Sequence, residues 1–153
     1  MSKKFILCKL TQKFFSDYPK DQYPEFEEKI GRPYVVFVIT IGGNKFGLPL
    51  RTNVRHGSCY KFKSTTRNTS SSTGIDFSKA VILNNPLYIG LETTIDNREY
   101  IELDGKIIHI MKKFEMYLNK YVNYKNKGVV DKNIEYTYRY STLQYYHNEL
   151  GIK

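Results

Sequence analysis

The sequence has little that would mark a membrane protein or a familiar metalloenzyme. No apolar run among the 153 residues reaches the length of about 18 that a membrane-spanning helix needs. The only two cysteines, Cys8 and Cys59, fit no metal-ligand spacing. We expect both to be reduced and buried, with a disulfide between them as the alternative. The short apolar stretch near Met1 is followed by no small-residue cleavage site, which favours a strand in a cytoplasmic protein over a signal peptide.

Familiar catalytic signatures are also missing. The sequence contains no GxxxxGK[ST] phosphate loop, no GxSxG elbow and no HExxH motif. One acidic group could in principle hold Mg²⁺ but lacks a recognised ligand spacing. Its members are Glu92, Asp96, Glu99, Glu102 and Asp104. We expect these acids to lie in a solvated turn and at a helix N-terminus, and we predict neither a metal nor a cofactor. A metal site at this group remains the alternative.

Positive charge and tyrosine are abundant. Lysine and arginine total 24 against 15 acidic residues, which gives a net charge of +9 at pH 7. This excess favours a polyanionic partner because phosphate contacts release counterions. The chain has 14 tyrosines and 9 phenylalanines. Most of these rings are expected in the core, but tyrosines exposed beside lysines can stack unpaired bases, as on single-stranded RNA.

The first third of the chain predicts strands and short helices. Residues 4–10 alternate well enough for a first strand, and the proline turns in residues 11–30 predict one or two short helices. Residues 34–41 form a β-branched and aromatic run, which predicts a buried central strand. Gly42-Gly43-Asn44 predicts a tight turn into a partner strand over residues 45–50.

The rest of the chain predicts further strands and a long helix. Residues 63–73 have no apolar anchor and predict a mobile loop. Residues 79–83 and 87–93 predict short strands. Apolar residues then recur at helical spacing, which predicts a long helix near 105–125 that Asp104 caps.

The C-terminal residues predict one more helix. Ser141 with Gln144 suggests a capping box, and Gly151 is expected to end the helix. No internal repeat or linker is visible. We therefore expect a single α+β domain over residues 1–153, with a mainly antiparallel, strongly curved sheet and flanking helices.

Residues 51–63, directly after the partner strand, carry the densest set of functional groups. Its basic side chains are Arg51, Arg55, His56, Lys61 and Lys63, and its hydrogen-bonding side chains include Thr52, Asn53, Ser58 and Tyr60. Very few acids lie near them in the sequence. Such a patch predicts a phosphate-binding site. Tyr60, Lys61 and Lys63 are expected to steer RNA toward it.

These residue types suit the cleavage of RNA without a metal ion. The reaction needs a base for the 2′-hydroxyl, charge stabilisation at the phosphate and an acid for the departing 5′-oxygen. His56 suits base or acid duty. Arg51, Arg55 and Lys79 suit charge stabilisation, and Thr52 can orient the phosphate.

Less specific interpretations remain open. A lone histidine in a basic loop is more often a surface residue, so a non-catalytic RNA-binding module that uses the patch for docking is the alternative. His109 is expected to be solvated and His147 structural. Cys59 has no visible third group to orient it with a histidine, which argues against a nucleophilic role.

Four short motifs, in order along nearly the whole chain, resemble the toxins of type III toxin–antitoxin systems. The resemblance is to the ToxN and AbiQ family, nearest its CptN and TenpN branches. The motifs are Gly31-Arg32-Pro33-Tyr34, Leu48-Pro49-Leu50-Arg51-Thr52-Asn53-Val54-Arg55-His56, Gly74-Ile75-Asp76-Phe77-Ser78-Lys79-Ala80-Val81-Ile82 and Tyr140-Ser141-Thr142-Leu143-Gln144.

The resemblance implies a compact, distorted barrel related to the Kid and MazF toxins. It also implies a metal-independent endoribonuclease that prefers adenine-rich sites. The partner would be a repeated RNA antitoxin that the toxin trims. The trimmed repeats would fold as pseudoknots, fill the active-site groove and alternate with the protein in a closed hetero-oligomer.

The family's site residues carry over one at a time. The small hydroxyl residue after the hairpin falls on Thr52, and the basic residue after it falls near Arg55. The basic residue that opens the central strand falls on Arg32, and the family's later lysine falls on Lys79, both as phosphate-binding groups. His56 stands where ToxN has an aromatic residue. It is therefore either a catalytic gain in this branch or a stacking residue. Because arginine does not lose its proton near neutral pH, the acid–base role shifts toward His56 or toward the surroundings of the 2′-hydroxyl itself.

Overall fold

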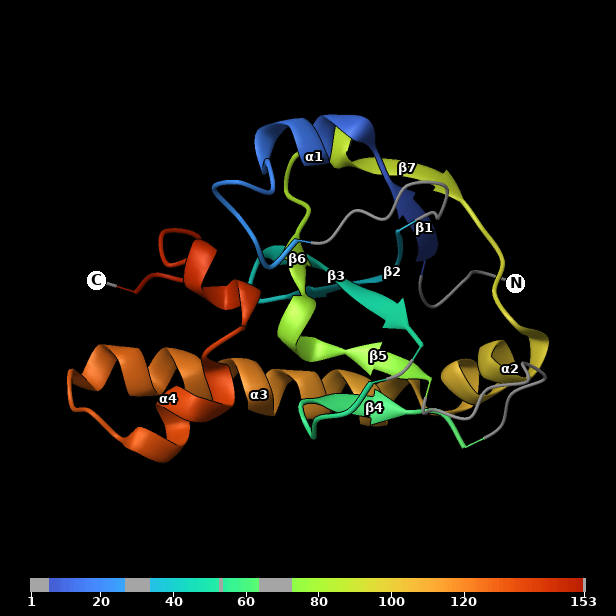
Figure 1. The fold of residues 1–153 in the computed structure, drawn as a ribbon. Helices are drawn as coiled ribbons and strands as arrows, with labels where there is room; N and C mark the ends of the chain where they lie inside the picture. Colours follow the sequence, from blue (N-terminus) through green and yellow to red (C-terminus); the bar gives the residue numbers. More distant parts are fainter. Residues whose placement is uncertain (1–5, 27–33, 53, 64–72, 153) are drawn as a thin grey trace.

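A seven-stranded antiparallel sheet forms the centre of the protein (Figure 1). The computed structural model describes residues 6–26, 34–52, 54–63 and 73–152. Their strands are β1 (Ile6–Leu10), β2 (Val35–Ile41), β3 (Asn44–Arg51), β4 (Cys59–Lys61), β5 (Gly74–Asp76), β6 (Val81–Ile82) and β7 (Ile89–Glu92). They follow the order β4-β5-β3-β2-β1-β7, and β6 also pairs with β3. The predicted α+β class is confirmed.

The described strands form an open sheet. Its path ends at β4 on one side and at β7 on the other, so these strands do not close into the distorted barrel that the resemblance implies. The long strand β3 shifts partners along its length. Phe46 and Gly47 pair with β6, whereas Leu50 and Arg51 pair with β5. The end of β3 therefore belongs to a second small ladder, β3–β5–β4. The predicted phosphate-binding segment, residues 51–63, begins at the end of β3 and includes β4.

The predicted hairpin is confirmed. Strands β2 and β3 pair from Val36 opposite Pro49 to Ile41 opposite Asn44. The two residues between them, Gly42 and Gly43, have φ values of 58° and 83°. A two-residue hairpin turn with positive φ at both positions matches the twist of the strands, and glycine adopts it without steric cost.

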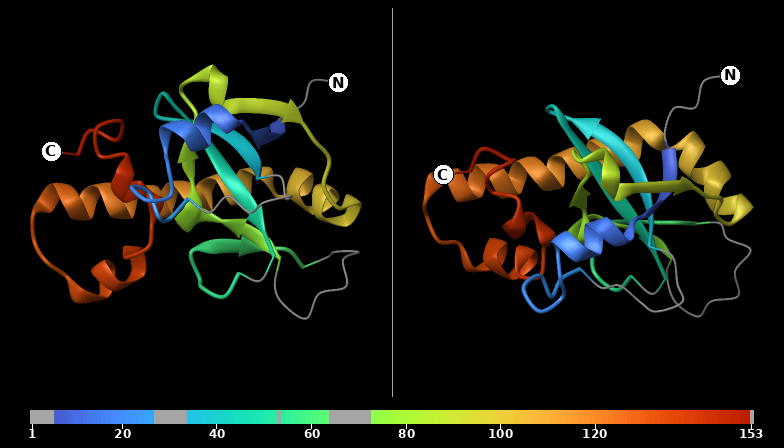
Figure 2. Two further views of the ribbon diagram at one scale, coloured as in Figure 1. Left: turned by 45° about the horizontal axis from the view of Figure 1, so that its top comes forward. Right: turned by 90° about the horizontal axis from the view of Figure 1, so that it is seen from above.

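The long helix predicted near residues 105–125 is present as α3 (Ile107–Lys127). It lies along one face of the sheet (Figure 2). The ring of Phe114 is fully buried and lies 5.2 Å from the ring of Phe46 in β3 and 5.5 Å from that of Phe77. Because Phe77 directly follows β5, this aromatic cluster joins α3 to both ladders. None of the helices in the described part of the chain combines the length and apolar character needed to cross a membrane.

The other helices begin and end at residues that differ in several cases from the predicted ones. They are α1 (Gln12–Asp17), α2 (Asn97–Gly105), α4 (Lys132–Tyr138) and the 3-10 turns η1 (Phe77–Lys79), η2 (Pro86–Tyr88) and η3 (Thr142–Tyr145). Asp104 does not cap α3 but lies inside α2. Asp96 caps α2, since its carboxylate accepts hydrogen bonds from the N–H groups of Arg98 and Glu99. Helix α4 was not predicted.

The C-terminal segment also contains less helix than the sequence predicted. Ser141 caps a single 3-10 turn, η3, by accepting a hydrogen bond from the N–H of Leu143. The Gln144 side chain donates to the carbonyl of Ser141 instead of reaching its N–H, so the capping box is incomplete. Cys8 and Cys59 are both buried as free thiols, as expected. The loop predicted for residues 63–73 falls mostly outside the described residues.

Candidate active site

Asp76 is a buried acid at the end of β5, where the chain turns into η1. Only 2% of it is exposed, and its neighbours Ile75 and Phe77 belong to the hydrophobic core. Its Oδ1 accepts hydrogen bonds from the Ser78 N–H at 3.0 Å and from the Ser78 hydroxyl at 2.6 Å. A buried carboxylate needs such partners because it has lost its water. Asp76 is thus the N-cap of the short 3-10 turn η1.

Two basic side chains from elsewhere in the sequence converge on this carboxylate. Nη1 of Arg51, at the end of β3, lies 3.2 Å from Oδ2 of Asp76. Nε2 of His56, from the loop before β4, lies 3.2 Å from Oδ1. Each oxygen of Asp76 therefore faces one basic group. We call Arg51, His56, Asp76 and Ser78 the Asp76 cluster.

The electrostatics of the Asp76 cluster favour an ionised carboxylate. Burial alone raises the pKa of Asp76, but other contacts outweigh it. The hydrogen bonds from His56 and Ser78 and the charges of His56 and Arg51 lower the pKa below its ordinary value. Asp76 is therefore a stable negative charge that holds a guanidinium and an imidazole next to each other.

The hydrogen bonds of His56 define its tautomer. The N–H of Ser58 donates to Nδ1 at 3.1 Å, so Nδ1 must be unprotonated. Nε2 then carries the proton and donates it to Asp76. The side chain remains 44% exposed. A buried carboxylate behind an exposed imidazole orients the ring and would stabilise the imidazolium form.

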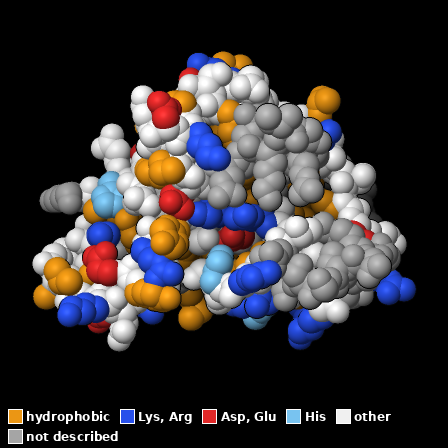
Figure 3. All heavy atoms as spheres, in the orientation of Figure 1, with side chains coloured by type: hydrophobic (Ala, Val, Ile, Leu, Met, Phe, Trp, Pro, Cys, Tyr) orange, Lys and Arg blue, Asp and Glu red, His pale blue; other side chains and the backbone are white. Residues whose placement is uncertain are grey.

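Other predicted residues are exposed in the segments that hold Arg51 and His56. Thr52 is exposed one residue after β3, and Arg55 is exposed next to His56. Lys61 and Lys63 are exposed at and beyond the end of β4. On the face shown in Figure 3, lysine and arginine side chains gather near a histidine at the middle of the surface.

Tyr60 needs correction as an RNA-binding residue. Its ring is 5% exposed and packs edge-on against Phe62. Its hydroxyl donates to the carboxylate of Glu102 at 2.5 Å, and the backbone N–H of Lys63 donates to the same carboxylate. Tyr60 therefore joins β4 to α2 and presents no ring face for base stacking.

Lys79 is also engaged within the protein. Its ammonium lies 2.6 Å from Oε2 of Glu25 and 3.0 Å from the carbonyl oxygen of Tyr140. Its side chain is only 12% exposed. Lys79 joins three distant segments in this conformation and does not reach out to grip a phosphate. Arg32 and Asn53, also predicted to bind phosphate, lie outside the described residues.

The sequence interpretation missed Asp76 and Ser78 as site residues. Both lie in a motif that was noted for its resemblance to the toxin family, yet neither was assigned a role. The available signal was an acid between two apolar residues, Ile75 and Phe77, shortly before the strand predicted over residues 79–83. A charge at such a position calls for a partner, because burying it alone is very costly.

The acidic group considered for Mg²⁺ is dispersed. Asp96 caps α2, Glu99 is buried and Glu102 binds Tyr60. Among the residues that the structure describes, no three His, Cys, Asp or Glu side chains are placed together as a metal site would require.

No family model, no curated protein and no solved structure matches this chain. The likeness to type III toxins therefore rests on the ordered sequence motifs alone.

Proposed function

We propose that this chain is an endoribonuclease that uses the Asp76 cluster to cut RNA without a metal ion. The observation that supports this proposal most directly is the buried Asp76 carboxylate, which holds an exposed imidazole beside a guanidinium. The exposed Arg55, Lys61 and Lys63 lie in the same segment and add positive charge. A general base and phosphate-binding cations supply two of the three functions that RNA transesterification needs, and water supplies the acid.

In the proposed reaction, His56 acts as the base. The Ser58 N–H first releases Nδ1, which then takes the proton of a ribose 2′-hydroxyl. The 2′-oxygen attacks the adjacent phosphorus, and the bond from phosphorus to the 5′-oxygen breaks. The leaving oxygen takes a proton from water, so the products are a 2′,3′-cyclic phosphate and a 5′-hydroxyl. The imidazolium returns its proton to solvent.

The other residues act on charge and position. Asp76 does not touch the RNA in this scheme; it orients the ring of His56 and stabilises the imidazolium that forms. Arg51 and Arg55 stabilise the negative charge that builds up on the phosphoryl oxygens. Thr52, exposed next to Arg51, orients the scissile phosphate.

We further propose that the enzyme is the toxin of a type III toxin–antitoxin pair in the cytoplasm. The support is the set of four motifs in family order, which includes Asp76 and Ser78. A repeated pseudoknot RNA would be trimmed at the site and then fill it, and protein and RNA would alternate in a closed assembly. A fold relation to the Kid and MazF toxins, with the sheet of the described residues left open, belongs to this same proposal.

A non-catalytic RNA-binding module is the second candidate, and one observation favours it. Both ring nitrogens of His56 are engaged, with Ser58 and with Asp76. A histidine held in this way need not move a proton, and the basic side chains near it can bind a phosphate. In that case the cluster would supply fixed charge alone.

An assay in EDTA separates the two candidates. The purified chain is incubated with a single-stranded adenine-rich RNA and with the same RNA carrying 2′-O-methyl riboses. The nuclease predicts cutting of the first RNA only, with 2′,3′-cyclic phosphate ends. Intact RNA that is nevertheless bound tightly, with affinity that falls as salt rises, would establish the binding module instead.

A further inference from the structure

We propose that Tyr136, Arg139 and Tyr140 form a platform on which unpaired RNA bases stack beside the Asp76 cluster. This inference rests on the proposed function, because it names the part of the RNA that the same site would recognise.

The platform consists of two exposed rings with a guanidinium between them. Tyr136 is 67% exposed and Tyr140 is 59% exposed. The guanidinium carbon of Arg139 lies 3.7 Å from the ring centroid of Tyr136 and 4.8 Å from that of Tyr140. Arg139 thus covers part of each ring and holds both in place through cation–π contacts. The exposure of both rings leaves surface on which a base can stack.

The backbone under the platform is well anchored. Between the exposed residues, Tyr138 points inward and stacks on Tyr117 of α3, with ring centroids 4.7 Å apart. Its hydroxyl donates to the carbonyl of Tyr117 at 2.7 Å. The Tyr117 hydroxyl in turn donates to Ser141, directly after the platform. The exposed rings therefore project from a rigid base, which lowers the entropy lost when a ligand binds.

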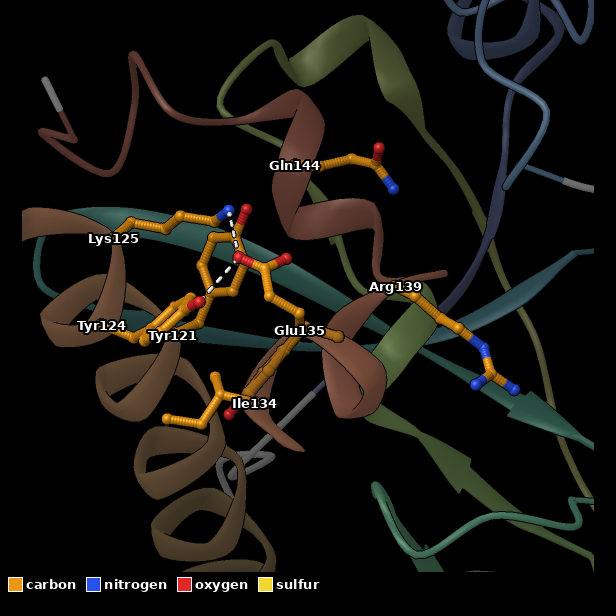
Figure 4. Close-up of a pocket in the computed structure, with 8 residues that line it drawn as sticks. Tyr121, Tyr124, Lys125, Ile134, Glu135, Arg139 and Gln144 are labelled. Carbon is orange, nitrogen blue, oxygen red and sulfur yellow. Dashed lines mark hydrogen bonds and ion pairs between the residues drawn. The ribbon is translucent and has the colours of Figure 1, made fainter. Parts of the chain in front are cut away.

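Arg139 lines one edge of a small pocket between α3 and α4, but its guanidinium points away from Glu135 (Figure 4). Figure 4 shows Arg139 pointing out of that pocket, whereas Tyr124 and Lys125 turn toward Glu135. The Tyr124 hydroxyl donates to Glu135 at 2.7 Å, and Lys125 lies 3.5 Å from it. The pocket thus has its own internal contacts, and Arg139 serves the outer surface.

Neighbouring residues, Lys79 and Thr142, link the platform to the Asp76 cluster. The carbonyl of Tyr140 accepts from Lys79, which ends the same 3-10 turn that Asp76 caps. The hydroxyl of Thr142, two residues after Tyr140, donates to the carbonyl of Ala80 and also lies 3.3 Å from the carbonyl of Ser78, a member of the cluster. A strand of RNA whose phosphate lies at the cluster would therefore bring a neighbouring base to the rings.

The chemistry of the platform favours bases over other ligands. Aromatic rings combined with arginine stack nucleobases with little regard to sequence, and the net charge of +9 attracts the connecting phosphates. A protein partner could also use exposed tyrosines and an arginine as anchors. A ligand that has phosphates but no bases distinguishes base stacking from charge alone.

The absence of tryptophan allows a direct reporter. Tyr140→Trp introduces a unique fluorophore into the platform. The probe is an oligoadenylate with 2′-O-methyl riboses, which the proposed reaction cannot cut, and its match is an abasic oligonucleotide of the same length and charge. Stacking predicts saturable quenching by the oligoadenylate and little by the abasic strand. Leu91→Trp is the control. Leu91 is 80% exposed in β7, which lies at one end of the strand order, whereas β4 and the Asp76 cluster lie toward the other end.

Affinity provides the second measurement. Tyr136→Ala and Tyr140→Ala should each weaken oligoadenylate binding by about 5- to 100-fold, whereas the Phe replacements keep the ring and the affinity. If the Ala variants bind as tightly as the unaltered chain, or if the abasic strand quenches equally, the platform is refuted while RNA cleavage stands. If the unaltered chain neither binds nor cuts RNA, the platform and the proposed function fail together.

Discussion

Oδ1 of Asp76 lies 3.2 Å from Nε2 of His56, although the two residues are twenty positions apart and only one of them is buried. The contact exists because β4 pairs antiparallel with β5, with Cys59 opposite Asp76. The loop before β4 is thereby folded back over the end of β5. The thiol of Cys59 donates to the carbonyl of His56 at 3.2 Å and helps hold the loop there.

Replacing Asp76 tests whether this contact matters for catalysis. Asp76→Asn keeps the size of the side chain but removes the charge that orients His56 and stabilises its protonated form. Cleavage should fall by about 100-fold or more in kcat, with little change in KM, since the loss falls on the transition state. Single-turnover cleavage of a short RNA measures this. An equal fall in affinity with unchanged kcat would contradict the positioning role.

The same substitution has a pH-dependent effect on stability. The pKa of Asp76 is lowered in the folded state, so its stabilisation is present at neutral pH and is lost as the pH falls below about 4. Asp76→Asn should therefore cost about 1–2 kcal/mol at pH 7 and clearly less at pH 3. Thermal unfolding of both proteins at the two pH values provides the measurement. A difference that does not shrink in acid would show that the carboxylate is not stabilised by its partners.

Gly74 tests the ladder that positions His56. A Cβ at this residue would overlap the carbonyl oxygen of Tyr60 and lie 3.1 Å from Cα of Lys61. These are backbone atoms of β4 and cannot move aside alone. Gly74→Ala should destabilise the fold by about 1–3 kcal/mol and reduce cleavage, because β4 and the His56 loop shift together.

The control for that substitution is Gly105→Ala, at the end of α2. Nothing lies within 4 Å of its Cβ position. Urea unfolding should show little change for this variant. If Gly74→Ala were equally harmless, the close pairing of β4 with β5 would be wrong.

Lys79 and Lys61 should separate structural from RNA-binding cations. In the unaltered protein the side chain of Glu25 is only 19% exposed. Lys79→Ala leaves its carboxylate without the ammonium partner and should cost about 1–3 kcal/mol of stability. Lys61 is exposed, so Lys61→Ala should leave stability nearly unchanged and weaken RNA binding. Unfolding curves and salt-dependent RNA titrations of both variants test this. Lys79→Ala with full stability and lost affinity would restore Lys79 as a phosphate ligand.

Local patterns predicted the parts of the fold that depend on nearby residues. The glycine pair between two apolar runs specified the β2–β3 hairpin, and helical spacing located α3. The expected start of α3 is close to the observed one, but its expected cap was wrong. Two aspartates, Asp96 and Asp104, lie near this start in the sequence. Only the first caps a helix, and the chain turns again at Lys106.

The site was only partly predictable because it depends on pairing between distant strands. The segment from Arg51 to Lys63 was recognised by its charge, and Arg51 and His56 do come together. Both contact Asp76, and this contact could not be predicted without knowing that β5 pairs with both β3 and β4. The burial of Tyr60 and the engagement of Lys79 are likewise long-range contacts, with Glu102 and Glu25. Residue type alone does not reveal them.

The most direct test of the account compares the unaltered chain with His56→Ala on one end-labelled adenine-rich RNA in EDTA, with the product ends identified. We predict that the unaltered chain yields 2′,3′-cyclic phosphate ends and that His56→Ala cuts at least about 100-fold more slowly while it still binds the RNA. Cutting by His56→Ala at an undiminished rate would contradict the proposal that His56 is the base.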